Sequence, residues 1–257
     1  MTRVILFTSG KGGVGKTTLT SNLAYALTSL GEDVIAMDAN LTTPNLGLHF
    51  GLHLVPNTLH DVLRGKIKLK DATYKHPYGF RVIPASMAVA DLTGVNVGKL
   101  HDITLELLGK ADFVIMDCAA GLGAEAVSAI GATDEVILVT NPDMPSVVDA
   151  LKTANIAKRL KKSVTGVVLN RVRGKRSELS RSEVEEMLEA PVIAEVPEDN
   201  AVAESIAMKV PVIDYNPGSP AAIEINRLAH TLVGRPFKGH GGGGARLLDR
   251  LVNWMVR

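Results

Sequence analysis

The sequence predicts an α/β protein in three layers, with a doubly wound, mostly parallel β-sheet between two layers of helices. Short apolar runs recur along the chain, and segments with helical periodicity separate most of them. Several runs are continuously apolar rather than alternating, which is typical of strands covered on both faces. At 257 residues the chain can bury a large core, and we expect one large domain rather than two small ones.

The first expected strand is Val4–Thr8, followed by Gly-Lys-Gly-Gly-Val-Gly-Lys-Thr at residues 10–17 and a helix over Thr17–Leu30. This octapeptide satisfies the phosphate-binding pattern G-x-x-x-x-G-K-[ST], and it lies between strand and helix as that loop requires. Its glycines let backbone N–H groups turn toward phosphate oxygens, and the helix N-terminus adds partial positive charge. The expected nucleotide-binding residues here are Gly10, Lys11, Gly12, Gly13, Val14, Gly15, Lys16, Thr17 and Thr18.

Six more runs are expected to be strands: 34–38, 80–84, 113–117, 135–140, 164–170 and 192–196. Right-handed crossovers would place ligands outside the carboxyl ends of these strands. Asp38, Asp117 and Asn170 lie at such ends. Asp117 ends an apolar run, and nucleoside triphosphatases carry a carboxylate for Mg²⁺ at the corresponding strand end. Thr17 would supply the hydroxyl ligand of the same ion.

The composition changes after residue 233. Residues 234–244 contain Pro236 and end in Gly-His-Gly-Gly-Gly-Gly, which is typical of a flexible linker. Residues 245–257 form an amphipathic helix when placed at about 100° per residue. We therefore expect a nucleotide-binding domain over 1–233, a linker over 234–244 and a terminal amphipathic helix over 245–257.

This helix is too short to span a bilayer, while its arginines and tryptophan favour a position among lipid headgroups. The alternative is that it packs on its own domain or on a dimer partner, as most amphipathic helices do. The residues expected to contact a membrane are Leu247, Leu248, Arg250, Leu251, Trp254 and Met255.

Composition excludes several classes of protein. The net charge of +1 argues against a surface coated for nucleic acid. Cys118 is the only cysteine, so disulfides within the chain and multi-cysteine metal sites are excluded. The chain begins with a core strand rather than a secretory signal, and no apolar run is long enough to span a bilayer. We expect a cytoplasmic protein whose membrane contact, if any, is peripheral.

Lys11, early in the loop, makes the sequence resemble the deviant Walker A motif of the MinD/ParA family of ATPases. The resemblance extends over residues 1–233 and the tail, and it is strongest to archaeal and bacterial MinD-type proteins. Four stretches resemble the family's switch I, switch II, the following strand end and the adenine-side loop: Asp38-Ala-Asn-Leu-Thr-Thr-Pro-Asn-Leu-Gly, Asp117-Cys-Ala-Ala-Gly-Leu, Val139-Thr-Asn-Pro-Asp and Val196-Pro-Glu-Asp.

The resemblance implies an ATP-dependent homodimer with the nucleotides sandwiched at its interface. Lys11 would reach the partner's phosphates and neutralise charge during phosphoryl transfer, like an arginine finger supplied in trans. Asn170 would read the adenine, with Pro197 and Asp199 in the neighbouring loop. Asp199 has an alternative role as the cap of a helix that begins near residue 201.

The resemblance also places Asp38 near Mg²⁺ and the attacking water. Many relatives have a second aspartate two residues later, whereas this chain has Asn40, which is uncharged and cannot take a proton at neutral pH. Because phosphoryl transfer depends mainly on positioning, we expect slow, partner-dependent hydrolysis, at a cost of about 10- to 1000-fold. Ala119 replaces a proline of many relatives. The expected catalytic residues are Lys11, Lys16, Asp38 and Asn40, and the expected metal ligands are Thr17, Asp38 and Asp117.

The function implied is that of a MinD-like ATPase that binds ATP and Mg²⁺, dimerises, and associates reversibly with the inner face of the cell membrane through its tail. Paired tails on a dimer would gain avidity on anionic lipids, and the protein would position partners at the cell-division site or elsewhere. Its activator or recruited partner is not identified by the sequence.

Three other functions are alternatives to that of a membrane-associated ATPase. A ParA-type DNA-partitioning ATPase needs a basic surface, for which the candidates are Arg171, Arg173, Lys175, Arg176 and Arg181. An iron–sulfur carrier of the same fold group needs paired cysteines, which a lone Cys118 does not supply. A nucleotide-gated scaffold with little hydrolysis is also compatible with the sequence, because Asn40 replaces the second aspartate of switch I.

Overall fold

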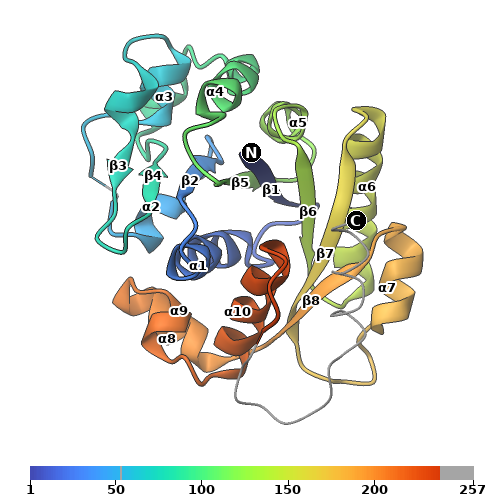
Figure 1. Cartoon of the computed structure of the whole chain (residues 1–257). Coiled ribbons are helices and arrows are strands. Elements are labelled where there is room, and N and C mark those ends of the chain that lie inside the picture. Colours follow the sequence, from blue (N-terminus) through green and yellow to red (C-terminus); the bar gives the residue numbers. More distant parts are fainter. Residues whose placement is uncertain (53, 238–257) are drawn as a thin grey trace.

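The computed structural model describes residues 1–52 and 54–237 (Figure 1). Its centre is an eight-stranded sheet with strand order β3-β4-β2-β5-β1-β6-β7-β8. Among the described residues β3 and β4 pair antiparallel, and all other neighbours pair parallel. The strands are β1 (Arg3–Ser9), β2 (Val34–Ala39), β3 (Tyr74–Lys75), β4 (Arg81–Ile83), β5 (Phe113–Ala120), β6 (Glu135–Thr140), β7 (Ser163–Val172) and β8 (Val192–Pro197).

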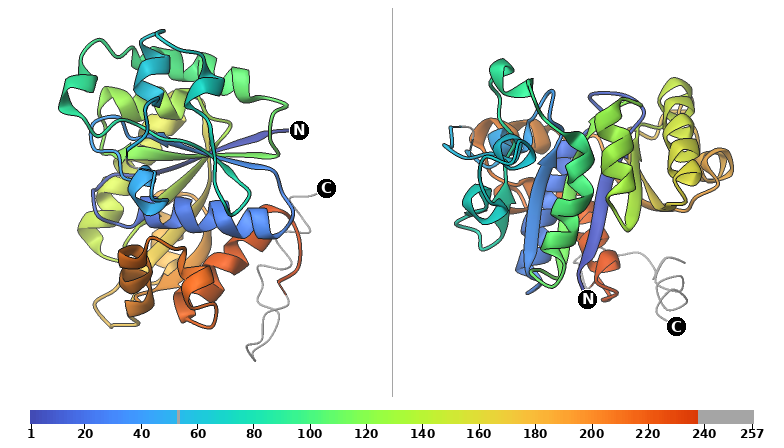
Figure 2. Two further views of the ribbon diagram at one scale, coloured as in Figure 1. Left: turned by 90° about the vertical axis from the view of Figure 1, so that its left-hand side faces the viewer. Right: turned by 90° about the horizontal axis from the view of Figure 1, so that it is seen from above.

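Helices cover both faces of the sheet (Figure 2). The helices are α1 (Lys16–Ser29), α2 (Leu46–His49), α3 (Leu59–Leu63), α4 (Leu100–Leu107), α5 (Ala124–Gly131), α6 (Met144–Arg159), α7 (Arg181–Leu188), α8 (Asn200–Met208), α9 (Val212–Tyr215) and α10 (Pro220–Leu232), with 3₁₀ turns at Leu69–Ala72, Val89–Leu92 and Val97–Lys99. No described helix is both long and apolar enough to cross a bilayer.

Two cores hold these layers together because strand side chains alternate between the faces. Val4 and Leu6 of β1 contribute to the core beneath α3 to α7, whereas Ile5 and Phe7 contribute to the core beneath α1, α2 and α8 to α10. β1 is buried along nearly its whole length. The predicted three-layer α/β fold is confirmed.

The seven strands expected from apolar runs are all present, with ends shifted by a few residues. The edge strand β3 is not expected from the sequence; it has only two residues and pairs with β4. Such a short segment carries no periodicity to detect, and its pairing depends on a chain reversal that includes Gly79 in the left-handed region at φ 101°.

The first residues of the expected linker pack on the domain. Arg235 donates to the carbonyl of Leu30 at 2.6 Å and pairs with Glu32. The ring of Phe237 lies 4.8 Å from the guanidinium carbon of Arg227 and contacts the His230 ring. Residues 234–237 therefore continue the domain surface, while residues 238–244 and the expected amphipathic helix over 245–257 lie outside the described residues.

Candidate functional site

The phosphate-binding loop joins β1 to α1 at the carboxyl edge of the sheet. Gly13 and Gly15 adopt φ values of 78° and 96°, and Gly15 is the N-cap of α1. A Cβ atom on Gly10 would lie 2.1 Å from the backbone carbonyl of Asp149, and one on Gly15 would lie 2.2 Å from Nδ2 of Asn170. Backbone conformation thus requires glycine at Gly13, close approach to α6 requires it at Gly10, and both reasons apply at Gly15.

Lys16 lies at the first position of α1, with its side chain turned back along the loop. It is 7% exposed, and its Nζ donates to Oγ of Ser9 at 2.8 Å. Burial lowers the pKa of Lys16, and the negative charge of Asp117 opposes that shift. Lys11, in contrast, is exposed, and no ion pair joins it to another described residue. The loop therefore presents one cation inward and one outward.

Asp38 and Asp117 are register partners on the neighbouring strands β2 and β5, and both are fully buried. Thr17 donates its hydroxyl to Oδ2 of Asp117 at 2.6 Å, whereas the buried Oδ1 of Asp117 has no hydrogen-bond partner among the described residues. Burial raises the pKa of Asp117 to about 6, although the Thr17 hydrogen bond and the Lys16 charge oppose it.

These groups fit a magnesium ion. A hydroxyl and a carboxylate with one unsatisfied oxygen are hard oxygen donors, and Mg²⁺ is held by few protein ligands plus water and substrate phosphates. No cluster of three or more His, Cys, Asp or Glu residues that could hold a metal ion is found in the described part of the chain.

Asp38 shapes the segment that follows β2. Its Oδ1 accepts from the backbone N–H of Asn40 at 3.2 Å, and its Oδ2 accepts from that of Leu46 at 3.0 Å. Burial, and then the charge of Asp117, raise the pKa of Asp38 well above its usual range. Both carboxylate oxygens are thus used to hold the two ends of switch I, and a role of Asp38 at the metal stays a prediction.

Asn40 closes a turn within switch I. Its Nδ2 donates to the carbonyl of Thr43 at 2.6 Å, and its Oδ1 accepts from the backbone N–H and hydroxyl of Thr43 at 3.2 and 3.1 Å. The residue is 7% exposed. Asn40 is therefore engaged at both ends of its amide in this conformation, and its contact with a water molecule also stays a prediction.

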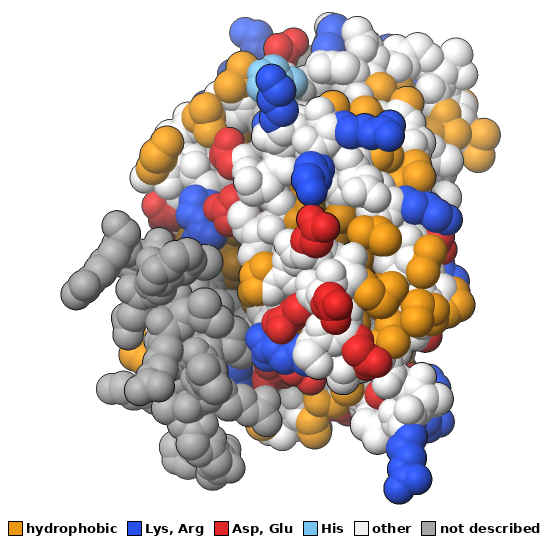
Figure 3. All heavy atoms as spheres, turned by 90° about the vertical axis from the view of Figure 1, so that its right-hand side faces the viewer, with side chains coloured by type: hydrophobic (Ala, Val, Ile, Leu, Met, Phe, Trp, Pro, Cys, Tyr) orange, Lys and Arg blue, Asp and Glu red, His pale blue; other side chains and the backbone are white. Residues whose placement is uncertain are grey.

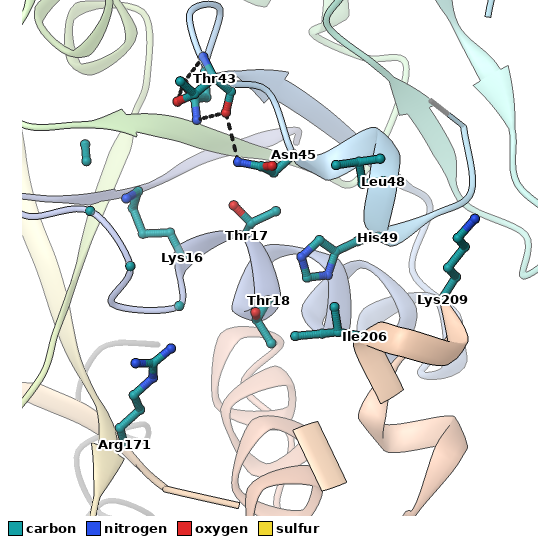
Figure 4. A pocket seen from close by; sticks show the side chains of 15 residues that line it. Lys16, Thr17, Thr18, Thr43, Asn45, Leu48, His49, Arg171, Ile206 and Lys209 are labelled. Atoms are coloured by element: carbon teal, nitrogen blue, oxygen red, sulfur yellow. Dashed lines mark hydrogen bonds between the residues drawn. The ribbon is translucent and has the colours of Figure 1, made fainter. Parts of the chain in front are cut away.

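A cavity of about 480 Å³ opens in front of the loop (Figure 4). We call it the phosphate cavity. One wall is the loop and the start of α1, a second is switch I with α2, and a third is Arg171 with the end of α8. The residues that line it include Gly12, Gly13, Gly15, Lys16, Thr17, Thr18, Asn40, Thr43 and Asn45. Six of the nine expected loop residues and Asn40 of switch I thus line one space. The expected site residues Gly10, Lys11, Val14, Asp38 and Asp117 are not among those that line it.

A second cavity, of about 330 Å³, lies between the end of β7 and α8, and we call it the adenine-side cavity. Asn170, Pro197 and Asp199 all line it, as the resemblance implies. Nδ2 of Asn170 donates to the carbonyl of Val14 at 2.7 Å, which ties the strand end to the loop. Asp199 is the N-cap of α8, as the alternative role required, because its Oδ1 accepts from the N–H of Ala201 at 2.9 Å.

Three basic or ionisable side chains that line the phosphate cavity are not among the residues expected from the sequence. His49 and Lys209 line it from α2 and from the end of α8, and Arg171 lines both cavities. Arg171 has a left-handed backbone at φ 57°, a strained conformation for a residue with a side chain. In Figure 4 its side chain extends toward the loop. Its position directly after Asn170 is the one available signal in the sequence, where Arg171 is a candidate only for a DNA-binding surface.

Comparisons with known proteins agree with this geometry. Residues 5–212 match the family model described as CbiA, the CobQ/CobB/MinD/ParA nucleotide-binding domain. An ATP-binding protein of Methanocaldococcus jannaschii is 40% identical over 93% of this chain and 90% of its own length. The septum site-determining protein MinD of Thermotoga maritima is 31% identical over 91% of this chain and 89% of its own length.

Solved structures of MinD proteins are also similar to this chain. MinD from Pyrococcus horikoshii, complexed with Mg-ADP, superposes with a TM-score of 0.87 at 36% identity and covers 90% of this chain and 96% of its own. MinD of the Aquifex aeolicus MinC:MinD complex superposes with a TM-score of 0.83 at 28% identity, covering 94% and 100%. The chain therefore belongs to the CobQ/CobB/MinD/ParA family of nucleotide-binding domains and is a MinD-like P-loop ATPase.

Proposed function

We propose that this protein binds ATP with Mg²⁺, dimerises around the nucleotide, hydrolyses it slowly, and uses this cycle to control attachment to the membrane. The observation that carries the proposal is the arrangement around the phosphate cavity. Lys16 is buried along the loop, Thr17 and Asp117 offer a hydroxyl and an unsatisfied carboxylate oxygen, and Lys11 is exposed and does not line its own cavity.

Each of these residues has a distinct task in the proposal. Backbone N–H groups of the loop and Lys16 bind the phosphates, while Thr17 and Asp117 hold the ion and its water. When bound, Mg²⁺ would neutralise negative charge on the phosphates. Lys11 of the partner subunit completes the site by offsetting the charge that develops on the transferred phosphoryl group.

The relatives support the nucleotide, the metal and a protein partner. The P. horikoshii protein is complexed with Mg-ADP, and the A. aeolicus protein is in a complex with MinC. By analogy, we propose that this chain also recruits a protein partner and that its nucleotide state controls that recruitment. Cell-division placement is the process that the names of these relatives favour.

Membrane attachment would come from the expected amphipathic helix over residues 245–257, with the protein peripheral on the inner face of the cell membrane. The described residues end at Phe237, on the surface formed by the carboxyl ends of α1 and α10. Seven residues, 238–244, would then connect this point to the helix. Because the apolar face of one short helix gives weak, reversible binding, two helices on a dimer would be needed for stable attachment.

Co-sedimentation with vesicles tests the proposal directly. The full chain, a truncation ending at Gly244 and a Trp254→Glu variant are mixed with phosphatidylglycerol–phosphatidylcholine vesicles in ATP and Mg²⁺, in ADP, or without nucleotide, and phosphate release is recorded in the same tubes. We expect the full chain to sediment with ATP, and both altered chains to stay in the supernatant while retaining nucleotide binding. A full chain that stays in the supernatant under every condition contradicts the membrane role.

A nucleotide-gated scaffold is the second candidate, and the contacts of Asn40 favour it. The amide is already hydrogen-bonded to Thr43 at both ends, and it cannot act as a base. In this case, sedimentation would respond to ATP in the experiment above, but phosphate release would stay at the level of a protein-free control.

DNA partitioning is disfavoured by ion pairing. Within the candidate basic cluster, Arg173 pairs with Glu198, and Arg181 pairs with Glu185 and Glu195. Acidic and basic side chains are also interspersed on the visible part of the face that carries α6 and α7 (Figure 3). DNA binding depends on counterion release by unpaired basic side chains, and paired arginines contribute little to it.

Arg171 should contribute to nucleotide affinity, because it lies between the two cavities. We expect Arg171→Ala to weaken binding of a fluorescent ATP analogue by about 10-fold, the loss of one charge-assisted hydrogen bond. Arg173→Ala is the matched control, since Arg173 pairs with Glu198 on the surface and lines neither cavity. Equal affinity of the Arg171→Ala variant and the wild type would remove Arg171 from the site.

A further inference from the structure

Glu125 joins the helix after switch II to switch I. It lies in the first turn of α5 and is half-buried. Its Oε2 accepts from the backbone N–H groups of Leu41 and Thr42 at 3.2 and 3.3 Å, and its Oε1 accepts from the Thr42 hydroxyl. One carboxylate thus binds three donors of a segment about 84 positions earlier in the chain.

These bonds hold a segment that has few other tethers to the rest of the domain. Asp38 holds its two ends, and Asn40 forms a turn with Thr43 inside it. His60 supports the middle of the segment. Its Nδ1 accepts from the N–H of Ser86, so its Nε2 donates to the carbonyl of Leu41 at 3.1 Å. Burial lowers the pKa of His60, which favours the neutral form of the ring.

The contact of Glu125 differs from these because its helix is also connected to the phosphate-binding loop. The N–H of Gly121, before α5, donates to the carbonyl of Ser9 at 3.0 Å. The hydroxyl of Ser9 accepts from Nζ of Lys16, and Ala120 lines the phosphate cavity. A continuous series of hydrogen bonds and short backbone segments thus runs from Lys16 through Ser9 and Gly121 to α5, and from Glu125 to switch I.

We propose that Glu125 is a positioning residue for ATP hydrolysis, which fixes switch I against the start of α5 so that Asn40 and Thr43 stay in the wall of the phosphate cavity. Glu125 does not itself line that cavity. Its effect is therefore on the geometry of the reacting groups rather than on nucleotide binding. This inference rests on the proposed ATPase function.

The proposal predicts which kinetic constant changes. The loop and α1 bind the phosphates without switch I, so Glu125→Ala should leave the affinity for ADP within about 2-fold of wild type, since no direct contact is lost. The kcat should fall by about 10- to 100-fold, the effect expected when reacting groups are displaced by about an ångström. A residue with a merely structural role would instead change affinity, kcat and melting temperature together.

Thr42 provides a graded variant. Thr42→Val removes one of the three hydrogen bonds to Glu125 and leaves the two backbone donors, so kcat should fall less than in Glu125→Ala. In the Glu125→Ala background the same change should have no further effect, because the interaction it removes is already lost. Thr42→Ser keeps the hydroxyl and should restore kcat. Glu106→Ala is the matched control, since Glu106 is an exposed carboxylate on α4 that pairs with Lys110.

Hydrogen exchange supplies a measurement that does not depend on activity. In the nucleotide-free protein, the amides of Leu41 and Thr42 should exchange faster in Glu125→Ala than in wild type or Glu106→Ala, because they lose their acceptor. If wild type hydrolyses no ATP, the proposed function fails, while the exchange result still decides whether Glu125 holds switch I. Unchanged exchange, or a Glu125→Ala enzyme with wild-type kcat, overturns the inference.

Discussion

Replacement of Lys11 by alanine should lower the rate of ATP hydrolysis by about 10³-fold or more, the effect of removing a cation that stabilises the transition state in trans. The side chain is exposed and does not line the cavity of its own subunit. Affinity of the monomer for nucleotide should therefore change little. Steady-state phosphate release and titration with a fluorescent nucleotide measure the two quantities separately.

Mixing two inactive variants shows whether Lys11 acts across the dimer. A Lys11→Ala subunit keeps its metal site, and an Asp117→Asn subunit keeps its Lys11. A mixture in equal amounts should recover up to about a quarter of wild-type activity, because half the dimers are mixed and each has one complete site. If the mixture recovers nothing although mixed dimers form, or if Lys11→Ala alone retains the wild-type rate, Lys11 does not act in trans.

Replacement of Asp117 by asparagine should lower kcat by about 10²- to 10³-fold at saturating ATP, because the site loses the negative charge that we propose holds the metal. Thr17 can still donate to the amide oxygen, and the buried position accepts a neutral group more readily than a carboxylate. The variant should therefore fold with at least the stability of the metal-free wild type. Phosphate release as a function of Mg²⁺ concentration, together with thermal unfolding, measures both effects.

Asp149→Asn is the matched control for that experiment. Asp149 lies on α6 near the loop and pairs with Lys152 at the surface, outside both cavities. Its replacement should leave the Mg²⁺ dependence unchanged. Hydrolysis by Asp117→Asn at the wild-type rate and the wild-type Mg²⁺ concentration would show that Asp117 does not hold the metal.

Several parts of the site could be predicted because their signals are local. The loop was recognisable from glycine spacing between an apolar run and a helix, and Asp117 from its place at the end of such a run. The sequence allows two roles for Asp199, one in the adenine-side loop and one as a helix cap. Its contacts with the N–H groups of Ala201 and Ala221 establish the capping role. Arg171 was assigned to a different surface, because its left-handed backbone is not visible in the sequence.

The fold class, the phosphate-binding loop and the strand ends at which Asp38, Asp117 and Asn170 lie can all be predicted from the sequence alone. These follow from periodicity and from residues a few positions apart, which act through local conformation. The pairing of Asp38 with Asp117 across β2 and β5, and the contact of Glu125 with switch I, become visible only in the folded chain. Such contacts depend on the order of the strands in the sheet. Neighbouring parallel strands are joined by long crossover connections, so residues that meet across two strands lie far apart in the sequence. No sequence pattern links the two residues of such a pair.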